Sequence, residues 1–190
     1  MVSIQKIQNA FIAVFVIYIP MWISYFIESA IHFQIGIFPR SFVFEDVFGV
    51  LGVWLSHANL DHIENNSISF LPVLIFMGLL EKNIFKTLFL LILSSGIAIW
   101  LLGSPNSFHI GASALIFASF GYILMSVFKG RFLYIIPIAL ALFYYGINYF
   151  INIFHGFMPH DNISIAGHLG GFISGIITAF FTNNKKEIKI

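Results

Sequence analysis

A serine and a histidine stand in two apolar stretches of the chain, and together their side chains could perform nucleophilic chemistry. Ser113 lies in the stretch GASALIF, and His168 lies in the stretch GHLGGFISGI. A serine hydroxyl is a weak nucleophile unless a neighbouring base takes its proton. An imidazole can take that proton and later return it to a leaving group. The pair therefore predicts acyl-transfer chemistry, provided that the fold brings the two side chains together.

A second polar cluster, SHANLDHIENN at residues 56–66, could supply the hydrogen-bond donors that acyl transfer needs. His62 and Asn66 are four residues apart and so share one helix face. Their side-chain N–H groups and the backbone N–H of Ser113 could stabilise a developing oxyanion. The start of a helix also offers unpaired N–H groups and the positive end of the helix dipole.

No acidic residue lies in the apolar stretch 163–182 to orient His168, so we expect a dyad in which packing orients the imidazole. Phe117 lies one turn beyond Ser113 on the same helix face, where its ring could hold that imidazole. Small residues at four-residue spacing allow helix backbones to approach closely. This spacing recurs at Gly167, Gly171 and Gly175.

Composition places the chain in a membrane. Of its 190 residues, 59% are hydrophobic and only 9% are charged, whereas a soluble domain has roughly 45–50% and about 25%. The net charge of +1 gives no support for a nucleic-acid partner. The absence of cysteine excludes disulfides, thiolate metal sites and a cysteine nucleophile.

Six apolar stretches of helix length predict an all-α bundle of six transmembrane helices. A membrane β-barrel would show shorter segments of alternating character. The first stretch is longer than the core of a signal peptide and has no A-x-A site after it, so we expect a retained helix. We expect residues 1–190 to form a single membrane domain with spans at about 7–27, 59–80, 84–102, 112–128, 132–150 and 163–182.

The basic residues predict the orientation of these spans. With six spans, all but Arg40 fall on one side of the membrane, and basic residues mark the cytoplasmic side. Both termini are therefore expected to be cytoplasmic. The residues on that side are Lys6, Lys82, Lys86, Lys129, Arg131, Lys185, Lys186 and Lys189.

This topology gives the polar residues a common depth. The second, fourth and sixth spans all enter from the outer side, and each carries its polar residues near that end. A polar group in hydrocarbon costs several kcal/mol unless it is compensated. The agreement in depth predicts one polar cavity, open outward and partly sunk in the membrane.

The loop at residues 28–58 is too apolar for a solvated loop and too interrupted for a span. It fits an amphipathic segment that lies in the outer interface. It also fits a loop packed on the outer mouth of the bundle, and both descriptions can hold together.

Each of these residues alone also fits a structural role. A serine in a membrane helix commonly bonds its own backbone, a histidine can join two helices, and glycine repeats indicate packing. Solvation at a helix start explains Asp61, Glu64 and Asn65, and loop positions explain His32, His109, His155 and His160. The prediction of a site depends on the joint occurrence of the candidate residues.

Taken in order, the motifs resemble the rhomboid family of intramembrane serine proteases. The matches are H-x4-H-x3-N at His57, His62 and Asn66, G-x-S at Gly111 to Ser113, G-H-x-x-G-x-x-x-G at residues 167–175, and Glu81 at the inner end of the second span.

The resemblance implies a Ser113–His168 dyad with no metal and no cofactor, and oxyanion-hole side chains at His62 and Asn66. It implies supporting roles for His57, Gly111, Phe117 and Gly171. It further implies an interfacial loop at 28–58, a cap loop at 151–162 and substrate entry beside the fifth span. The implied setting is a prokaryotic inner membrane, with substrates that are single-span membrane proteins cut near the outer face.

Three alternatives remain open on the sequence. The first is a catalytically inactive rhomboid relative that binds membrane clients. The second is a small-solute transporter, although no inverted repeat is visible. The third is a zinc protease that uses His57, His62 and His168, although the HEXXH motif is absent.

Overall fold

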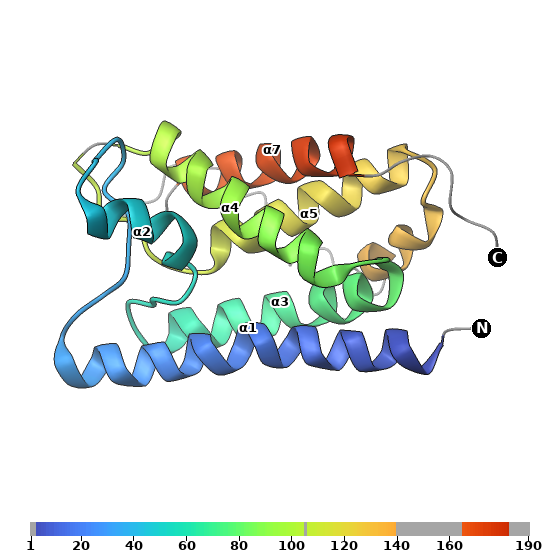
Figure 1. Cartoon of the computed structure of the whole chain (residues 1–190), viewed down its shortest axis with the longest axis horizontal. Coiled ribbons are helices and arrows are strands. Elements are labelled where there is room, and N and C mark those ends of the chain that lie inside the picture. The colour runs from blue at the N-terminus through green and yellow to red at the C-terminus, as the bar shows by residue number, and fades with distance from the viewer. Residues whose placement is uncertain (1–2, 105, 140–164, 183–190) are drawn as a thin grey trace.

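The structure is a computed structural model, and it describes residues 3–104, 106–139 and 165–182. Within these ranges the regular secondary structure is helical, apart from one pair of bridged residues, which confirms the all-α prediction. The elements are α1 (Ile4–Ile31), α2 (Phe44–Gly52), α3 (Leu60–Leu80), α4 (Ile84–Leu102), α5 (Ser113–Phe128), the 3₁₀ turn η1 (Phe132–Tyr134) and α7 (Ile165–Thr182) (Figure 1).

The helices follow the predicted spans closely. Three of them, α1, α3 and α4, are long and apolar enough to cross a membrane, and α5 and α7 are shorter apolar helices. Helix α1 ends four residues later than predicted, at a left-handed His32. Of the predicted span 132–150, the structure describes η1 and helical residues 135–139. The remainder of that span and the predicted cap loop 151–162 lie outside the described residues.

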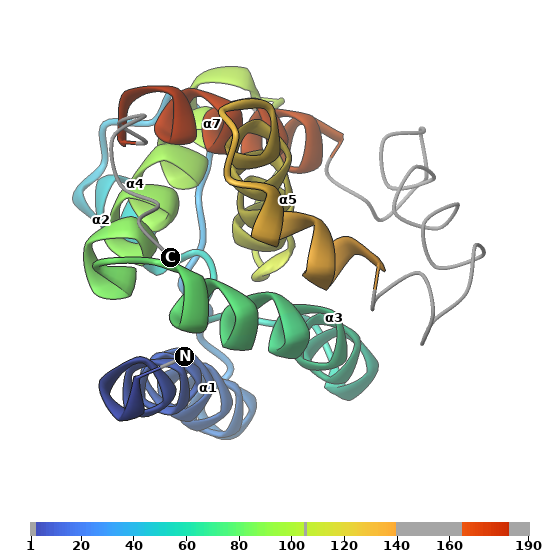
Figure 2. The same cartoon turned by 90° about the vertical axis from the view of Figure 1, so that its right-hand side faces the viewer.

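The helices form two groups that meet in a common core. Figures 1 and 2 show α1 beside α3 on one side of the molecule and α5 beside α7 on the other, with α4 packed against the second group. Apolar side chains from α1, α3 and α5 fill the space between the groups. The largest of those that are fully buried include Ile17, Met21, Ile63, Phe70, Leu74, Leu115 and Tyr122.

Polar groups of α1 attach it to α3 inside the apolar region. The hydroxyl of Tyr18 donates to the carbonyl oxygen of Ser67, and the indole Nε1 of Trp22 donates to the Ser67 hydroxyl at 3.2 Å. Nearer the start of α1, a Cβ on Gly78 of α3 would overlap the backbone of Ala10. In lipid a polar side chain gains most from a partner on a neighbouring helix, so these contacts hold α1 on the helix that carries His62 and Asn66.

Helices α5 and α7 approach so closely that only glycine fits at their contacts. A Cβ on Gly171 would overlap the carbonyl oxygen of Ala114, and one on Gly175 would overlap that of Ala118. In the other direction, a Cβ on Gly121 would overlap the carbonyl oxygen of Phe172. The expected small-residue packing is therefore present at Gly171 and Gly175.

Helix α2 lies within the long loop 28–58 and packs on α4. A Cβ on Gly96 of α4 would overlap the carbonyl oxygen of Val50, so the two helices touch through their backbones. The buried carboxylate of Asp46 accepts a hydrogen bond from the Phe38 backbone N–H at 3.1 Å. The opposite face of α2 exposes large apolar side chains at Phe44, Val47, Phe48 and Leu51. The loop is thus packed on the bundle, and it also presents an apolar surface suited to an interface.

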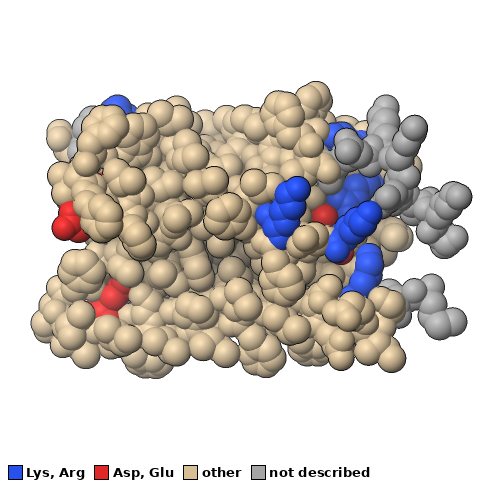
Figure 3. All heavy atoms as spheres, in the orientation of Figure 1, with Lys and Arg blue, Asp and Glu red and all other residues tan. Residues whose placement is uncertain are grey.

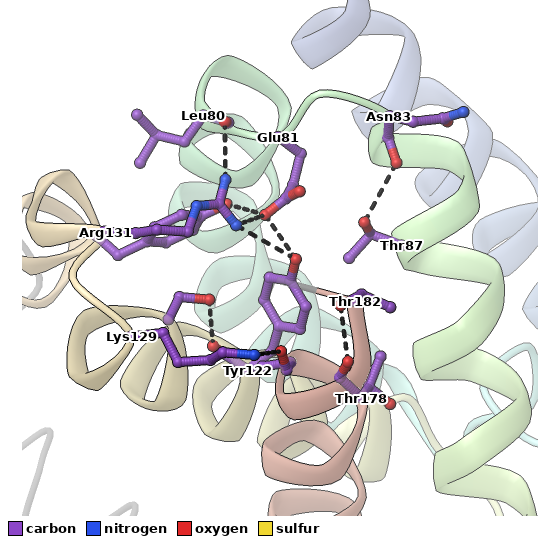
Figure 4. Close-up of polar contacts among 12 residues, drawn as sticks. Leu80, Glu81, Asn83, Thr87, Tyr122, Lys129, Arg131, Thr178 and Thr182 are labelled. Atoms are coloured by element: carbon purple, nitrogen blue, oxygen red, sulfur yellow. Dashed lines mark hydrogen bonds and ion pairs between the residues drawn. The ribbon is translucent and has the colours of Figure 1, made fainter. Parts of the chain in front are cut away.

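A buried carboxylate joins three elements where α3 ends. The Glu81 Oε1 accepts hydrogen bonds from the Tyr122 hydroxyl at 2.8 Å, from the Tyr134 hydroxyl and from Arg131 Nη1 at 2.7 Å (Figure 4). Arg131 Nη2 also donates to the carbonyl oxygen of Leu80 at 3.1 Å. A buried charge is tolerated when it is paired and its lone pairs are filled, and these contacts tie α3, α5 and η1 together.

Charged residues are divided between the two ends of the bundle. Figure 3 shows lysines and arginines gathered at the end where α1 begins and α7 ends, with acidic residues and one small basic patch at the opposite end. We call these the basic end and the loop end. Lys129 Nζ donates at the basic end to the carbonyl oxygens of Ala179 and Phe180, at 3.3 and 2.5 Å. Arg40 lies at the loop end, so the described basic residues are distributed as predicted.

The glycine contacts yield a stability prediction. Gly175→Val should lower the Tm of the detergent-solubilised protein, because the new side chain meets the Ala118 backbone and overpacking costs about 1–3 kcal/mol or more. Thermal unfolding measures the change. Ile177→Val places the same side chain on the exposed face of α7 and should leave Tm nearly unchanged. Equal effects of the two substitutions would contradict the packing argument.

Candidate active site

The loop that leads into α5 is fixed by hydrogen bonds to the loop 28–58. Ile37 and His109 form an antiparallel bridge in which each backbone N–H donates to the other residue's carbonyl oxygen at 3.0 Å. The Gly111 N–H donates to the Val53 carbonyl oxygen at 2.9 Å. The start of α5, where Ser113 is the first residue, is therefore held from outside the helix.

Gly111 provides the space in which two polar side chains meet the backbone before Ser113. A Cβ on Gly111 would lie 2.7 Å from Cε1 and 2.8 Å from Nε2 of His62, and 3.7 Å from the Asn66 Nδ2. Gly111 also has a φ of 112°, a conformation that residues with a side chain rarely adopt. A glycine is thus required at this position for both reasons.

The hydrogen bonds of His62 fix the position of its proton. The Ala58 backbone N–H donates to the His62 Nδ1 at 3.4 Å, so the neutral ring carries its proton on Nε2, the atom that lies against Gly111. The backbone N–H of His62 is capped by the Asn59 side chain at 2.9 Å. The ring therefore presents an N–H donor toward the start of α5.

The amide of Asn66 is a second donor at the same place. Asn66 is 8% exposed, and its Nδ2 has no hydrogen-bond partner among the described residues. Leaving a buried donor unsatisfied costs about 1–3 kcal/mol. Such a group calls for an explanation, and a ligand atom that arrives between Asn66 and Ser113 would provide one.

His57 connects this cluster to the backbone of α5. Its Nε2 accepts from the Ala112 N–H at 3.4 Å, and its Nδ1 lies 3.4 Å from the Leu55 carbonyl oxygen, to which it donates in this tautomer. Its ring packs edge-on against His62, with centroids 5.0 Å apart. Burial, and to a smaller extent the neighbouring His62, lowers the pKa of His57 to about 4. His57 is therefore neutral at physiological pH and acts as an acceptor.

His168 lies on α7 beside the face of α5 that carries Ser113. Its ring stacks on Phe117 with centroids 4.2 Å apart and an interplanar angle of 19°, and the residue is 9% exposed. Phe117 is one turn beyond Ser113, and Gly171, one turn beyond His168, touches Ala114. These contacts place the imidazole over Phe117 where α5 faces α7, and the half-buried Ser113 lies one turn earlier on α5.

The structure separates the candidates into two groups. Ser113, His57, His62, Asn66 and Gly111 gather at the start of α5, and His168 with Phe117 and Gly171 lines the adjoining α5–α7 contact. Asp61, Glu64 and Asn65 are exposed at the start of α3, in agreement with the solvated interpretation. The described residues contain no group of three His, Asp or Glu side chains arranged to hold a metal, so they give the zinc alternative no support.

Three residues near the site, His109, Glu28 and Ser56, are not part of the matched sequence motifs. His109 is held through its backbone rather than by catalytic contacts, and its role is to pair two loops. Glu28 and Ser56 form a buried hydrogen bond next to His57. An acidic residue near the end of an apolar helix was the available signal for Glu28.

Comparisons with known proteins identify a family for this chain. The family model described as "Rhomboid domain" matches residues 45–185, a range that includes every candidate site residue. An uncharacterized protein of Mycobacterium tuberculosis (strain H37Rv) is 32% identical over 148 residues, which cover 72% of this chain and 59% of that protein. The Bacillus subtilis (strain 168) protein named "Putative rhomboid protease YdcA" is 30% identical over 142 residues, which cover 70% of this chain and 66% of that protein.

The chain spans about 55–59% of the length of the mycobacterial relatives it matches. The family match extends over well more than half of the chain, and it contains α3, α4, α5, α7 and the candidate site residues described above. The chain is an integral, multi-pass membrane protein that belongs to the rhomboid family.

Proposed function

We propose that this chain is an intramembrane serine endopeptidase that cuts transmembrane segments of single-span membrane proteins through a Ser113–His168 dyad. The observation that carries the proposal is the convergence of two side-chain donors, His62 Nε2 and Asn66 Nδ2, on the backbone just before Ser113. Membership of the rhomboid family supports intramembrane proteolysis at the level of the family. The substrates and the mechanism are proposals for this chain.

The first half of the reaction forms an acyl-enzyme. The Ser113 hydroxyl attacks the scissile carbonyl carbon while the His168 imidazole takes the hydroxyl proton. The negative charge on the carbonyl oxygen is stabilised by His62 Nε2–H, the Asn66 amide and the Ser113 backbone N–H. The tetrahedral intermediate then collapses, the C–N bond breaks, and His168 delivers its proton to the leaving amine.

The second half of the reaction consumes water. A water molecule attacks the acyl carbon while His168 takes one of its protons, and the same donors stabilise the second oxyanion. Collapse of this intermediate breaks the ester bond, releases the carboxylic acid product and returns the proton to the Ser113 oxygen. The chemistry of both halves is complete with side chains of this chain and water.

The length of α5 supports a site below the membrane surface. Its 16 residues span about 24 Å, less than the ~30 Å hydrocarbon core. Lys129 and Arg131 follow its other end, and basic residues mark the cytoplasmic interface. With that end at the inner interface, Ser113 lies several ångström inside the outer one, where a substrate helix must unwind into a hydrated cavity to expose a carbonyl. We propose that both termini are cytoplasmic and that the membrane is a prokaryotic inner membrane.

An inactive relative that binds membrane clients is the alternative. The Asn66 Nδ2 has no partner among the described residues, which argues for activity, because a purely binding protein has no need of such a donor next to the residues before Ser113. Labelling of the serine decides between the two functions.

A fluorophosphonate probe should label Ser113 in the purified wild-type protein, and Ser113→Ala and His168→Ala should abolish labelling. Mass spectrometry of the labelled peptide measures the result. Ser119→Ala removes a hydroxyl from the same helix, where it only donates to the Leu115 carbonyl oxygen, and should retain labelling. A folded wild type that resists the probe, under conditions where an active rhomboid protease reacts, would favour the inactive alternative.

Asn66→Ala should lower kcat by about 10²–10³-fold with little change in KM, the effect typical of a lost oxyanion donor. Because the Nδ2 has no partner among the described residues, its removal leaves no described group unsatisfied, and Tm should be retained. The assay is cleavage of a single-span substrate, with Asn65→Ala as an exposed neighbouring control. A lower Tm with unchanged kcat would assign Asn66 a structural role instead.

The site should also make stability depend on pH. The pKa of His57 falls from its ordinary value of 6.5 to about 4 on folding, so between pH 6.5 and 4 the unfolded chain binds the additional proton. Stability is fully present above pH 6.5 and is lost as the pH falls toward 4. Thermal unfolding should show this decline in the wild type and a smaller one in His57→Gln, whose amide oxygen can still accept from Ala112. The exposed His32→Gln should behave as wild type, and an unaltered slope in His57→Gln would refute the assignment.

A further inference from the structure

A polar cavity of about 470 Å³ lies at the loop end, next to the proposed active site. Its walls include Glu28 and Ser29 from the end of α1, His32 and Gln34 from the following loop, and His57. The Gln34 side chain donates to the His57 carbonyl oxygen at 3.4 Å. Since His57 Nε2 accepts from Ala112, a single imidazole ring separates the cavity from the backbone that precedes Ser113.

Glu28 carries one unsatisfied carboxylate oxygen in the wall of this cavity. The side chain is only 6% exposed. Its Oε1 accepts from the Ser24 hydroxyl at 3.1 Å, from the Ile35 N–H at 3.3 Å and from the Ser56 hydroxyl, whereas Oε2 has no hydrogen-bond partner among the described residues. Glu28 also lies in the last turn of α1, where the helix dipole disfavours a negative charge and no basic residue compensates it.

The described part of the chain does not offer a cation for this oxygen. Arg40 is the basic residue at the loop end, and its Nη1 donates to the Leu101 carbonyl oxygen at 2.9 Å. The other described basic residues lie at the basic end. Figure 3 shows further acidic residues at the loop end, and Glu45 and Asp46 lie in the first turn of α2 and Asp61 in the first turn of α3. The field at this end therefore attracts cations.

We infer that this cavity binds a cationic side chain, lysine or arginine, carried by the substrate on the outer flank of the bond that is cut. The inference rests on the proposed function. The ammonium or guanidinium group donates to Glu28 Oε2 in a charge-assisted hydrogen bond. Ser29 and His32, which also line the cavity, are exposed, so the incoming group reaches Glu28 past them. Phe33 and Phe108, which also line the cavity, pack on the aliphatic stem.

This subsite would narrow the range of substrates. Membrane proteins carry few lysines and arginines on the outer flanks of their spans. A protease whose cavity holds a carboxylate without a counter-charge among the described residues would select the few substrates that carry a lysine or arginine on the outer flank. The low pKa of His57 keeps that ring uncharged, so it does not repel the incoming cation.

The test uses pairs of single-span substrates that differ at one residue of the outer flank, which is lysine in one and glutamine in the other. Successive pairs shift this residue by one position along the flank, and each position is one register. At one register, lysine should raise kcat/KM about tenfold over glutamine, in keeping with one charge-assisted hydrogen bond, and salt should reduce the ratio. Glu28→Gln should bring this ratio close to one, whatever its absolute rate. Glu45→Gln removes the same charge from the exposed part of α2 and should keep the ratio.

Ser29→Lys gives an independent test that keeps Glu28 in place. A lysine at this exposed wall position supplies an ammonium from the chain itself, so it should also lower the ratio. The inference is overturned if the wild type cleaves all lysine and glutamine substrates equally, or if Glu45→Gln lowers the ratio as much as Glu28→Gln. It is also overturned if free n-butylamine inhibits the wild type but not Glu28→Gln, while lysine gives no faster cleavage than glutamine at any position of the substrate. Absence of both cleavage and probe labelling would instead contradict the proposed function.

Discussion

The carbonyl oxygens of Ala114 and Ala118 occupy the space that side chains at Gly171 and Gly175 would fill, and this contact between α5 and α7 governs the rest of the molecule. Inside a membrane, helices associate through close packing and polar contacts rather than through the hydrophobic effect. Ser113 precedes Ala114 by one residue and His168 precedes Gly171 by one turn. The packing that stabilises the bundle therefore also sets how near the hydroxyl and the imidazole can come.

At the loop end, backbone hydrogen bonds rather than helix packing hold the site in place. The bridge between Ile37 and His109 and the hydrogen bond from Ala112 to His57 hold the entry to α5 through backbone groups. This support lets the site keep a buried donor on Asn66 without a partner among the described residues, at a cost of about 1–3 kcal/mol. A donor that is already in place needs no reorganisation when charge develops on a bound substrate.

The two buried carboxylates of the bundle show how the ends differ. At the basic end, one oxygen of Glu81 accepts from two tyrosines and Arg131, so the charge is neutralised and serves to join helices. At the loop end, Glu28 fills only one of its oxygens and faces a cavity. The two carboxylates thus differ because Glu81 has a counter-charge in Arg131, whereas Glu28 has none among the described residues.

The sequence by itself determined the helical membrane class and the limits of α3, α4 and α5 to within a residue or so. These features follow from hydropathy, helical periodicity and the distribution of basic residues, all of which are local in the chain. Only the tertiary structure decided that α2 sits on Gly96, that Tyr18 and Trp22 hold Ser67, and that Glu28 meets Ser56. Those contacts join residues far apart in sequence through loops or across helix faces, and no periodic pattern specifies them.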